Sequence, residues 1–302
     1  MVKLVDNDII DRHKGETAVV CAHGPTFKEH LGPILRLQQA KKVIRFSPNN
    51  WFSMMNREWD PDYWVLSSNV DTVLNYCDYI NDTSSSILFA DSVDLTPYDW
   101  IEENIENDYY GYDQRHFKND KCLDILKNFK DHYTENKNFD FDRYGNNTIM
   151  WQPPFEGTPG GVDVKGRCCH RIVEGRKTIQ EMLQENTGYQ EQYSSGSTVA
   201  LHMLAFTVLM GFEKVYVAGL DLDYGLGYAN ENMEAPEDFW KNSNETKNLL
   251  NDLHVINESA KKKGTQIINL NPGVWYGIFE QTDSIPITLT HRERLLGNRE
   301  TI

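Results

Sequence analysis

The segment His23-Gly24-Pro25-Thr26 has residue types suited to holding a phosphorylated ligand. It follows the apolar run 17–22 and precedes a helical pattern. A glycine lets a phosphate or ribose approach the backbone closely, and the start of a helix offers free N–H groups to an anion. The segment matches neither the GxxxxGK[ST] phosphate loop nor the GxGxxG dinucleotide fingerprint, so the sequence does not support NAD or flavin. An ordinary Gly-Pro turn is the alternative interpretation.

A second candidate segment is the hydroxyl-rich turn Ser194-Ser195-Gly196, which precedes the strongly apolar stretch 198–211. This stretch is apolar nearly all round, which predicts a buried helix. Hydroxyl and N–H groups at the start of such a helix can hold a phosphate or a sugar carboxylate. The alternative is that the turn only caps the helix.

The third segment contains Asp221 and Asp223, which follow the apolar run 214–219. In an extended segment, residues two apart point the same way. Two carboxylates so placed could hold a divalent metal and a nucleotide diphosphate. A structural role for Asp221 is the alternative, and no metal ligand is assigned from the sequence. Tyr224 and Tyr228 follow, and their phenolic hydroxyls could donate hydrogen bonds to a leaving phosphate.

Short apolar runs around these segments predict the elements that position them. The predicted strands cover 17–22, 42–46, 63–67, 86–90, 214–219 and 265–270, and the predicted helices cover 27–40, 198–211 and 242–262. The alternation predicts an α/β, Rossmann-like fold, with a mostly parallel sheet and helices on both faces. Ligands bind such sheets at the carboxyl ends of the strands, where the polar segments lie. Thr26 and Glu29 have capping-box spacing, so Thr26 is predicted to cap its helix.

The order of the patterns predicts three parts of the chain. Residues 1–91 are predicted to form the first part of a nucleotide-binding α/β core, and residues 191–302 its second part. Residues 92–190 are rich in Asp, Asn, Tyr and Lys, and we expect a loop-rich insertion or lid there. Irregular surface packing is the alternative for this stretch.

Two segments resemble a known family. The sequence SSGSTVALHMLAFTVLMGFEKVYVAGLDLDYGLGYA, at 194–229, resembles the signature region of bacterial lipo-oligosaccharide sialyltransferases, and CAHGPTFKE, at 21–29, is similar to that family's opening Gly-Pro-Ser loop. The same outline occurs in motility accessory factors and in archaeal pterin diphosphokinase-like proteins. Those proteins also have a Pro-Asp-Tyr/Phe before the third strand, as in Pro61-Asp62-Tyr63. The resemblance spans the first ninety and the last hundred and ten residues, and not the middle.

The resemblance implies a glycosyltransferase-A-like fold with a lid and an inverting, metal-independent transfer from a CMP-activated nine-carbon sugar to a glycan acceptor. No cofactor beyond the nucleotide-sugar substrate is implied. By position, the resemblance implies nucleotide contacts for Gly24, Pro25 and Thr26, ribose or base contacts for Asn49 or Asn50 and for Asn69, donor contacts for Ser195 and Gly196, and assistance to the leaving phosphate from Tyr224 and Tyr228. His23, Ser194 and Asp221 are candidate binding residues from their own places in the three segments.

The chain departs from the family at two positions. His23 stands where the family has Asn, and the family's general-base histidine, expected near 244–248, is missing there. His254 is the nearest candidate for that base. One alternative function is a pterin diphosphokinase-like enzyme that uses ATP and magnesium, with Asp221 and Asp223 as ligands. Another is a non-catalytic relative that binds a nucleotide or sugar.

Composition favours a small-molecule or glycan substrate. The net charge of −15 repels nucleic acid and anionic membrane surfaces. The five cysteines match no zinc or disulfide pattern, which indicates a reducing compartment. The N-terminal residues lack a signal pattern, and the longest apolar run, 199–210, is too short to span a bilayer. We therefore expect a cytoplasmic protein; peripheral membrane contact and homo-oligomerisation stay open.

Overall fold

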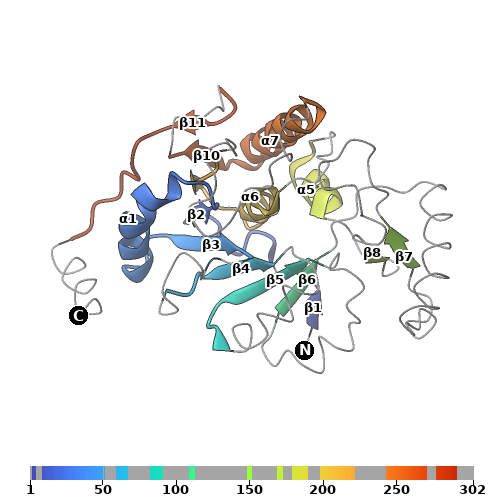
Figure 1. The fold of residues 1–302 in the computed structure, drawn as a ribbon, viewed down its shortest axis with the longest axis horizontal. Coiled ribbons are helices and arrows are strands. Elements are labelled where there is room, and N and C mark those ends of the chain that lie inside the picture. The colour runs from blue at the N-terminus through green and yellow to red at the C-terminus, as the bar shows by residue number, and fades with distance from the viewer. Residues whose placement is uncertain are drawn as a thin grey trace.

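A computed structural model describes residues 2–4, 9–49, 51, 59–66, 82–90, 109–112, 148–151, 169–172, 179–189, 198–221, 243–270 and 277–290. The main sheet contains β1 (Val2–Leu4), β2 (Thr17–Cys21), β3 (Ile44–Pro48), β4 (Tyr63–Leu66), β5 (Ser86–Ala90), β6 (Tyr109–Tyr112), β9 (Lys214–Ala218), β10 (Gln266–Asn269) and β11 (Glu280–Gln281). A separate antiparallel pair consists of β7 (Thr148–Trp151) and β8 (Cys169–Ile172). The described helices are α1 (Phe27–Gln39), α5 (Ile179–Thr187), α6 (Val199–Leu209) and α7 (Ser243–Lys263). Figure 1 shows these elements.

The nine strands of the main sheet lie in the order β1-β6-β5-β4-β3-β2-β9-β10-β11, and each pairing between them is parallel. From β2 the chain steps outward through β3, β4, β5 and β6. From β9 it steps the other way through β10 to β11. The direction of winding therefore reverses between β2 and β9, which pair directly along five residues, Thr17↔Lys214 to Cys21↔Ala218. This is the place where open parallel sheets bind ligands.

Helices cover both faces of the sheet, because successive strand residues point to opposite sides. In β2, Ala18 and Val20 pack in a cluster with α5, α6 and α7, whereas Val19 and Cys21 pack in a cluster with α1. Figure 1 shows α5, α6 and α7 grouped together and α1 apart from them. Helix α6 is buried along nearly its whole length, as its continuous apolar sequence predicts. The predicted parallel α/β fold is confirmed.

One predicted strand is displaced, and others were not predicted. The expected strand 42–46 is observed two residues later as β3, because the turn after α1 extends through Lys41, whose φ is 53°, and the Lys42 N–H donates to the Leu37 carbonyl at 2.9 Å. Strand β6, of sequence YYGY, was not predicted because it lies in a polar stretch. Strand β6 joins the main sheet, and helix α5 packs against α6. Because both elements lie within residues 92–190, described parts of this stretch belong to the core. The predicted domain boundaries stay predictions.

Among the helices that the structure describes, none combines the length and the apolar character needed to cross a membrane.

Candidate functional site

The loops after β2 and β9 are joined by backbone hydrogen bonds beyond the ends of the two strands. The Ala22 N–H donates to the Ala218 carbonyl at 2.8 Å, and the Gly24 N–H donates to the Gly219 carbonyl at 2.7 Å. These bonds bring the predicted segments 23–26 and 219–221 together at the carboxyl edge of the sheet. They meet where the winding direction reverses.

A side-chain contact closes this junction. The buried carboxylate of Asp221 accepts the Thr26 N–H on Oδ2 at 2.9 Å and the Thr26 hydroxyl on Oδ1. The negative charge therefore lies at the start of α1, where the helix dipole and the backbone donors favour an anion. Both carboxylate oxygens have a protein donor, and their partner is in the other loop. Asp221 thus holds the two loops in one arrangement.

Two details predicted from the sequence are wrong. Thr26 does not cap α1 with its side chain, because its hydroxyl donates to Asp221 and its own dihedral angles, φ −69° and ψ −14°, are already helical. The start of α1 also does not offer free N–H groups to a phosphate. The Phe27, Lys28 and Glu29 N–H groups donate to the carbonyls three residues earlier, at 3.0, 3.4 and 3.1 Å, and the Thr26 N–H donates to Asp221.

The contact between the loops accounts for glycine at two positions. A Cβ on Gly24 would overlap Asp221 Oδ2 and the Gly219 carbonyl oxygen. Gly219 has a φ of +70°, and a Cβ there would lie 2.6 Å from both the Ala22 carbonyl oxygen and Phe27 Cβ. Gly219 begins a predicted segment, but the sequence analysis assigned it no role. Its signal was a glycine placed directly after an apolar strand and two residues before an aspartate.

The imidazole of His23 is the unusual side chain of this site. The residue is partly exposed, but its Nε2 is buried and has no hydrogen-bond partner among the described residues. Burial lowers the pKa of His23 to about 4, so the ring is neutral at physiological pH. Two residues earlier, burial raises the pKa of the Cys21 thiol to about 12. The thiol is therefore protonated and unreactive.

Asn49 directly follows the neighbouring strand β3 and also lies at the carboxyl edge. Its φ of 22° is left-handed, and its backbone is held on both sides. The Asn49 N–H donates to the Val65 carbonyl at 3.0 Å, and its own carbonyl accepts the Trp64 Nε1–H at 2.7 Å. The structure therefore brings His23, Asn49 and Asp221 to the ends of three adjacent strands.

Several predicted site residues cannot be placed. Asn50, Asn69, Ser194, Ser195, Gly196, Tyr224 and Tyr228 lie outside the described residues. The first described residue after the serine turn is Thr198, which caps α6 by accepting the Ala200 N–H at 3.3 Å. Its helix runs back to β9, so α6 begins at the carboxyl edge of the sheet. The predicted role of the serine turn stays a prediction.

His254 lies on α7, and no contact among the described residues joins it to this cluster. It lies eleven residues after the start of α7 at Ser243, about 16 Å along the helix axis at 1.5 Å per residue. Its side chain is exposed, and it interacts electrostatically with Glu258, one turn further on. The role of His254 as the base stays a prediction.

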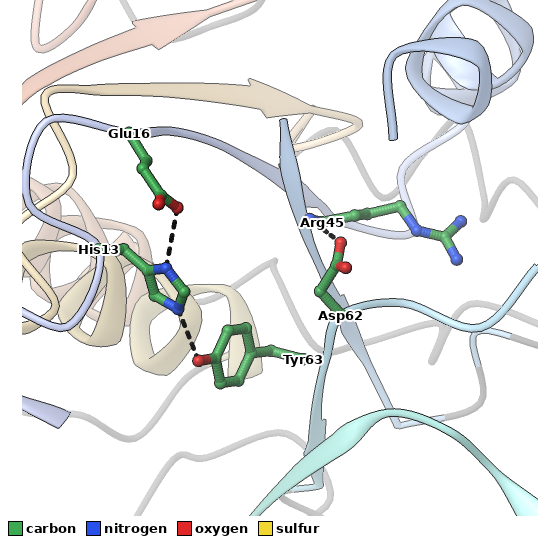
Figure 2. A network of polar contacts seen from close by, with 5 residues as sticks. All are labelled: His13, Glu16, Arg45, Asp62 and Tyr63. Carbon is green, nitrogen blue, oxygen red and sulfur yellow. Dashed lines mark hydrogen bonds and ion pairs between the residues drawn. The ribbon is translucent and has the colours of Figure 1, made fainter. Parts of the chain in front are cut away.

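A second polar cluster lies at the opposite, amino-terminal edge of the sheet. His13 contacts the Glu16 carboxylate through Nδ1 at 2.9 Å and the Tyr63 hydroxyl through Nε2 at 2.7 Å, as Figure 2 shows. Its ring stacks on Phe212 with centroids 4.9 Å apart. Both ring nitrogens have partners within the protein, so this cluster fastens the segment before β2 to the start of β4.

Comparisons with known proteins give a likeness in structure only. No protein-family model matches the chain, and no curated protein sequence matches it. Two solved structures of the sialyltransferase CstII from Campylobacter jejuni are similar to it. The complex with cytidine-5'-monophosphate shares 10% identity, covering 89% of this chain and 86% of that chain, with a TM-score of 0.40. The complex with CMP-3FNeuAc shares 9% identity, covering 91% and 89% of the two chains, with a TM-score of 0.38. Likeness at this level does not by itself identify an activity for this chain.

Proposed function

We propose that this chain is a glycosyltransferase that binds a CMP-activated, sialic-acid-like sugar at the junction of β2 and β9 and transfers the sugar to a glycan acceptor. The observation that supports the proposal is the joining of loops 23–26 and 219–221 at the reversal of the sheet winding. This position is where open parallel sheets bind nucleotides. The same two loops lie within the sequence segments that resemble bacterial sialyltransferases.

The proposed chemistry needs charge stabilisation on the departing nucleotide. Tyr224 and Tyr228 follow the Asp221 loop in sequence, and we propose that their hydroxyls donate hydrogen bonds to the phosphate as it leaves. Tyr228→Phe is then expected to lower turnover more than CMP affinity. Equal loss of both would assign Tyr228 to binding alone. His254→Gln tests the predicted base: it should reduce turnover by a factor of roughly 10² to 10⁴ if His254 deprotonates the acceptor.

We propose that the reaction does not use a metal. Both oxygens of Asp221 accept hydrogen bonds from Thr26, so this carboxylate is committed to joining the loops. The alternative, an ATP- and magnesium-dependent pterin diphosphokinase-like enzyme, would need Asp221 as a metal ligand. That role would require the Thr26 contact to be rearranged.

Thermal unfolding with CMP, CDP, UDP and ATP, each with and without Mg²⁺, tests the proposal. We expect CMP to raise the melting temperature by the same amount with and without Mg²⁺. Stabilisation by ATP only with Mg²⁺ would favour the kinase-like alternative. CMP binding without transfer or hydrolysis of any CMP-sugar would favour the non-catalytic relative. His13→Leu, which changes the opposite edge of the sheet, is the matched control and should leave the response to CMP unchanged.

A further inference from the structure

We propose that His23 determines ligand specificity: its Nε2 hydrogen-bonds an uncharged part of the nucleotide, the base or the ribose, while the phosphate lies away from the start of α1. The inference rests on the proposed function, because it takes the ligand to be a nucleotide. It deepens that function by orienting the ligand across the site.

The first argument is the unsatisfied imidazole nitrogen. His23 Nε2 is buried and makes no hydrogen bond in the part of the chain that the structure describes. A buried polar atom without a partner is costly, so such atoms are uncommon unless a ligand or water satisfies them. The backbone on either side is fixed by the bonds from Ala22 to Ala218 and from Gly24 to Gly219. The imidazole is therefore attached to a rigid part of the junction.

The second argument is that the start of α1 is already occupied by an anion. The Asp221 carboxylate accepts the Thr26 N–H there, and the next three N–H groups donate to backbone carbonyls. A phosphate in this place would find no free N–H group on residues 26–29 and would face a buried negative charge. We therefore place the nucleotide phosphate away from the start of α1, and the group that reaches His23 is the neutral nucleoside.

The third argument is the charge state of the ring. Because burial lowers the pKa of His23 to about 4, the imidazole has one donor nitrogen and one acceptor nitrogen at neutral pH and no positive charge. A neutral ring suits a hydroxyl or a ring nitrogen of a nucleoside. It gives a phosphate none of the attraction that an imidazolium would give.

Calorimetric titration of cytidine, CMP and inorganic phosphate into wild type, His23→Leu and His23→Asn tests the inference. We expect His23→Leu to weaken cytidine and CMP by the same factor, roughly tenfold for one lost hydrogen bond. We expect His23→Asn, which keeps a donor and an acceptor, to recover part of the affinity. Millimolar inorganic phosphate should not bind wild type at this position.

Thermal unfolding of the ligand-free proteins gives a readout that needs no ligand. Because Leu removes an unsatisfied polar atom, His23→Leu should raise the melting temperature by about 2 °C. The matched control is His13→Leu, which removes a ring whose two nitrogens are both paired, and it should lower the melting temperature.

The outcomes separate the two proposals. The role of His23 would be overturned, and nucleotide binding left intact, by either of two results. One is a loss of CMP affinity in His23→Leu without a loss of cytidine affinity, and the other is wild type that binds CMP but not cytidine. A lowered melting temperature for His23→Leu would show that the imidazole is a structural residue and would also overturn it. Failure of wild type to bind either cytidine or CMP would overturn the proposed function, and the inference with it.

Discussion

The two edges of the central strands differ in how their polar groups are satisfied. At the amino edge, both ring nitrogens of His13 have partners, Glu16 and Tyr63, and the ring is stacked on Phe212. At the carboxyl edge, His23 has a buried nitrogen with no partner among the residues that the structure describes. Both ring nitrogens of the histidine at one edge are thus paired, whereas the histidine at the other edge has a nitrogen left unpaired by the described part of the chain.

The difference shows that stabilising contacts and a ligand-binding group can lie at opposite edges of one sheet. Contacts at the amino edge hold the segment before β2 in place. Because both ring nitrogens of His13 are already paired, a ligand would gain little hydrogen bonding there. At the carboxyl edge, Asp221 and the two glycines fix the loops, and the rigid junction presents an unsatisfied group. Strain and unsatisfied polar groups are tolerated where the surrounding structure holds them in place, and functional sites are where they concentrate. Changes at the two edges should therefore have different consequences.

The largest expected effect compares two left-handed glycines, one from each edge. Gly15 has a φ of +81° with nothing near its missing Cβ, whereas Gly219 has a φ of +70° with two atoms at 2.6 Å. Gly219→Ala should lower the free energy of unfolding by about 4 kcal/mol, from the left-handed backbone and the overlap together. Gly15→Ala should cost only the backbone part, about 1 kcal/mol. Urea unfolding measures both, and equal losses would contradict the tight contact between the loops.

The next effect is the pH dependence due to His23. Its folded-state pKa of about 4 lies below the ordinary value of 6.5, so the unfolded chain binds the proton more readily. The free energy of unfolding is therefore not reduced by His23 above pH 6.5, and it falls as the pH decreases from 6.5 toward 4. Wild type should lose about 3 kcal/mol more than His23→Gln over this range. Parallel curves of unfolding free energy against pH for the two proteins would mean that the ring is not desolvated.

A smaller effect distinguishes two carboxylates. Asp221 is buried and accepts two bonds from Thr26, whereas Asp62 at the amino edge is exposed and accepts the Arg45 N–H at 2.8 Å (Figure 2). Asp221→Asn should cost about 2 kcal/mol of unfolding free energy, because an amide cannot accept at both positions. It should also weaken CMP binding. Asp62→Asn should cost about 1 kcal/mol and leave CMP binding unchanged. The reverse order of effects on CMP affinity would place the ligand at the amino edge.

The smallest effect is expected for Tyr63→Phe. The change removes the hydroxyl that contacts His13 Nε2 at 2.7 Å, and it keeps the aromatic ring of residue 63 stacked on Phe46. The expected loss is about 1 kcal/mol of unfolding free energy. Calorimetry should find the same CMP affinity as in wild type. A changed affinity would show that the two edges are coupled.

The sequence predicted most of the core elements and the residues at the strand ends. The apolar runs identified β2, β4, β5 and β9 to within one residue, because buried parallel strands are continuously apolar. Strand β6 could not be identified in this way, since its YYGY sequence gains its place from pairing with β5 and β1. The placement of Gly24 and Asp221 at strand ends was also predicted correctly.

What could not be predicted is how the strand ends meet. Thr26 and Asp221 are 195 residues apart, and their contact depends on β2 lying next to β9, which no local pattern specifies. Without that contact, Thr26 had the spacing of a helix cap and the start of α1 had the form of an anion site. The long-range bond reverses both interpretations. It also explains why Gly24 is a glycine: the loop opposite, rather than a ligand, leaves no room for a Cβ.

Backbone amide hydrogen exchange with and without CMP tests the central claim most directly. If the nucleotide binds where β2 and β9 meet, CMP should slow exchange in the segments 22–27 and 219–221 and leave the segment 11–16 unchanged. Protection confined to the segment 11–16 and the start of β4, or no protection in either loop at saturating CMP, would contradict the account.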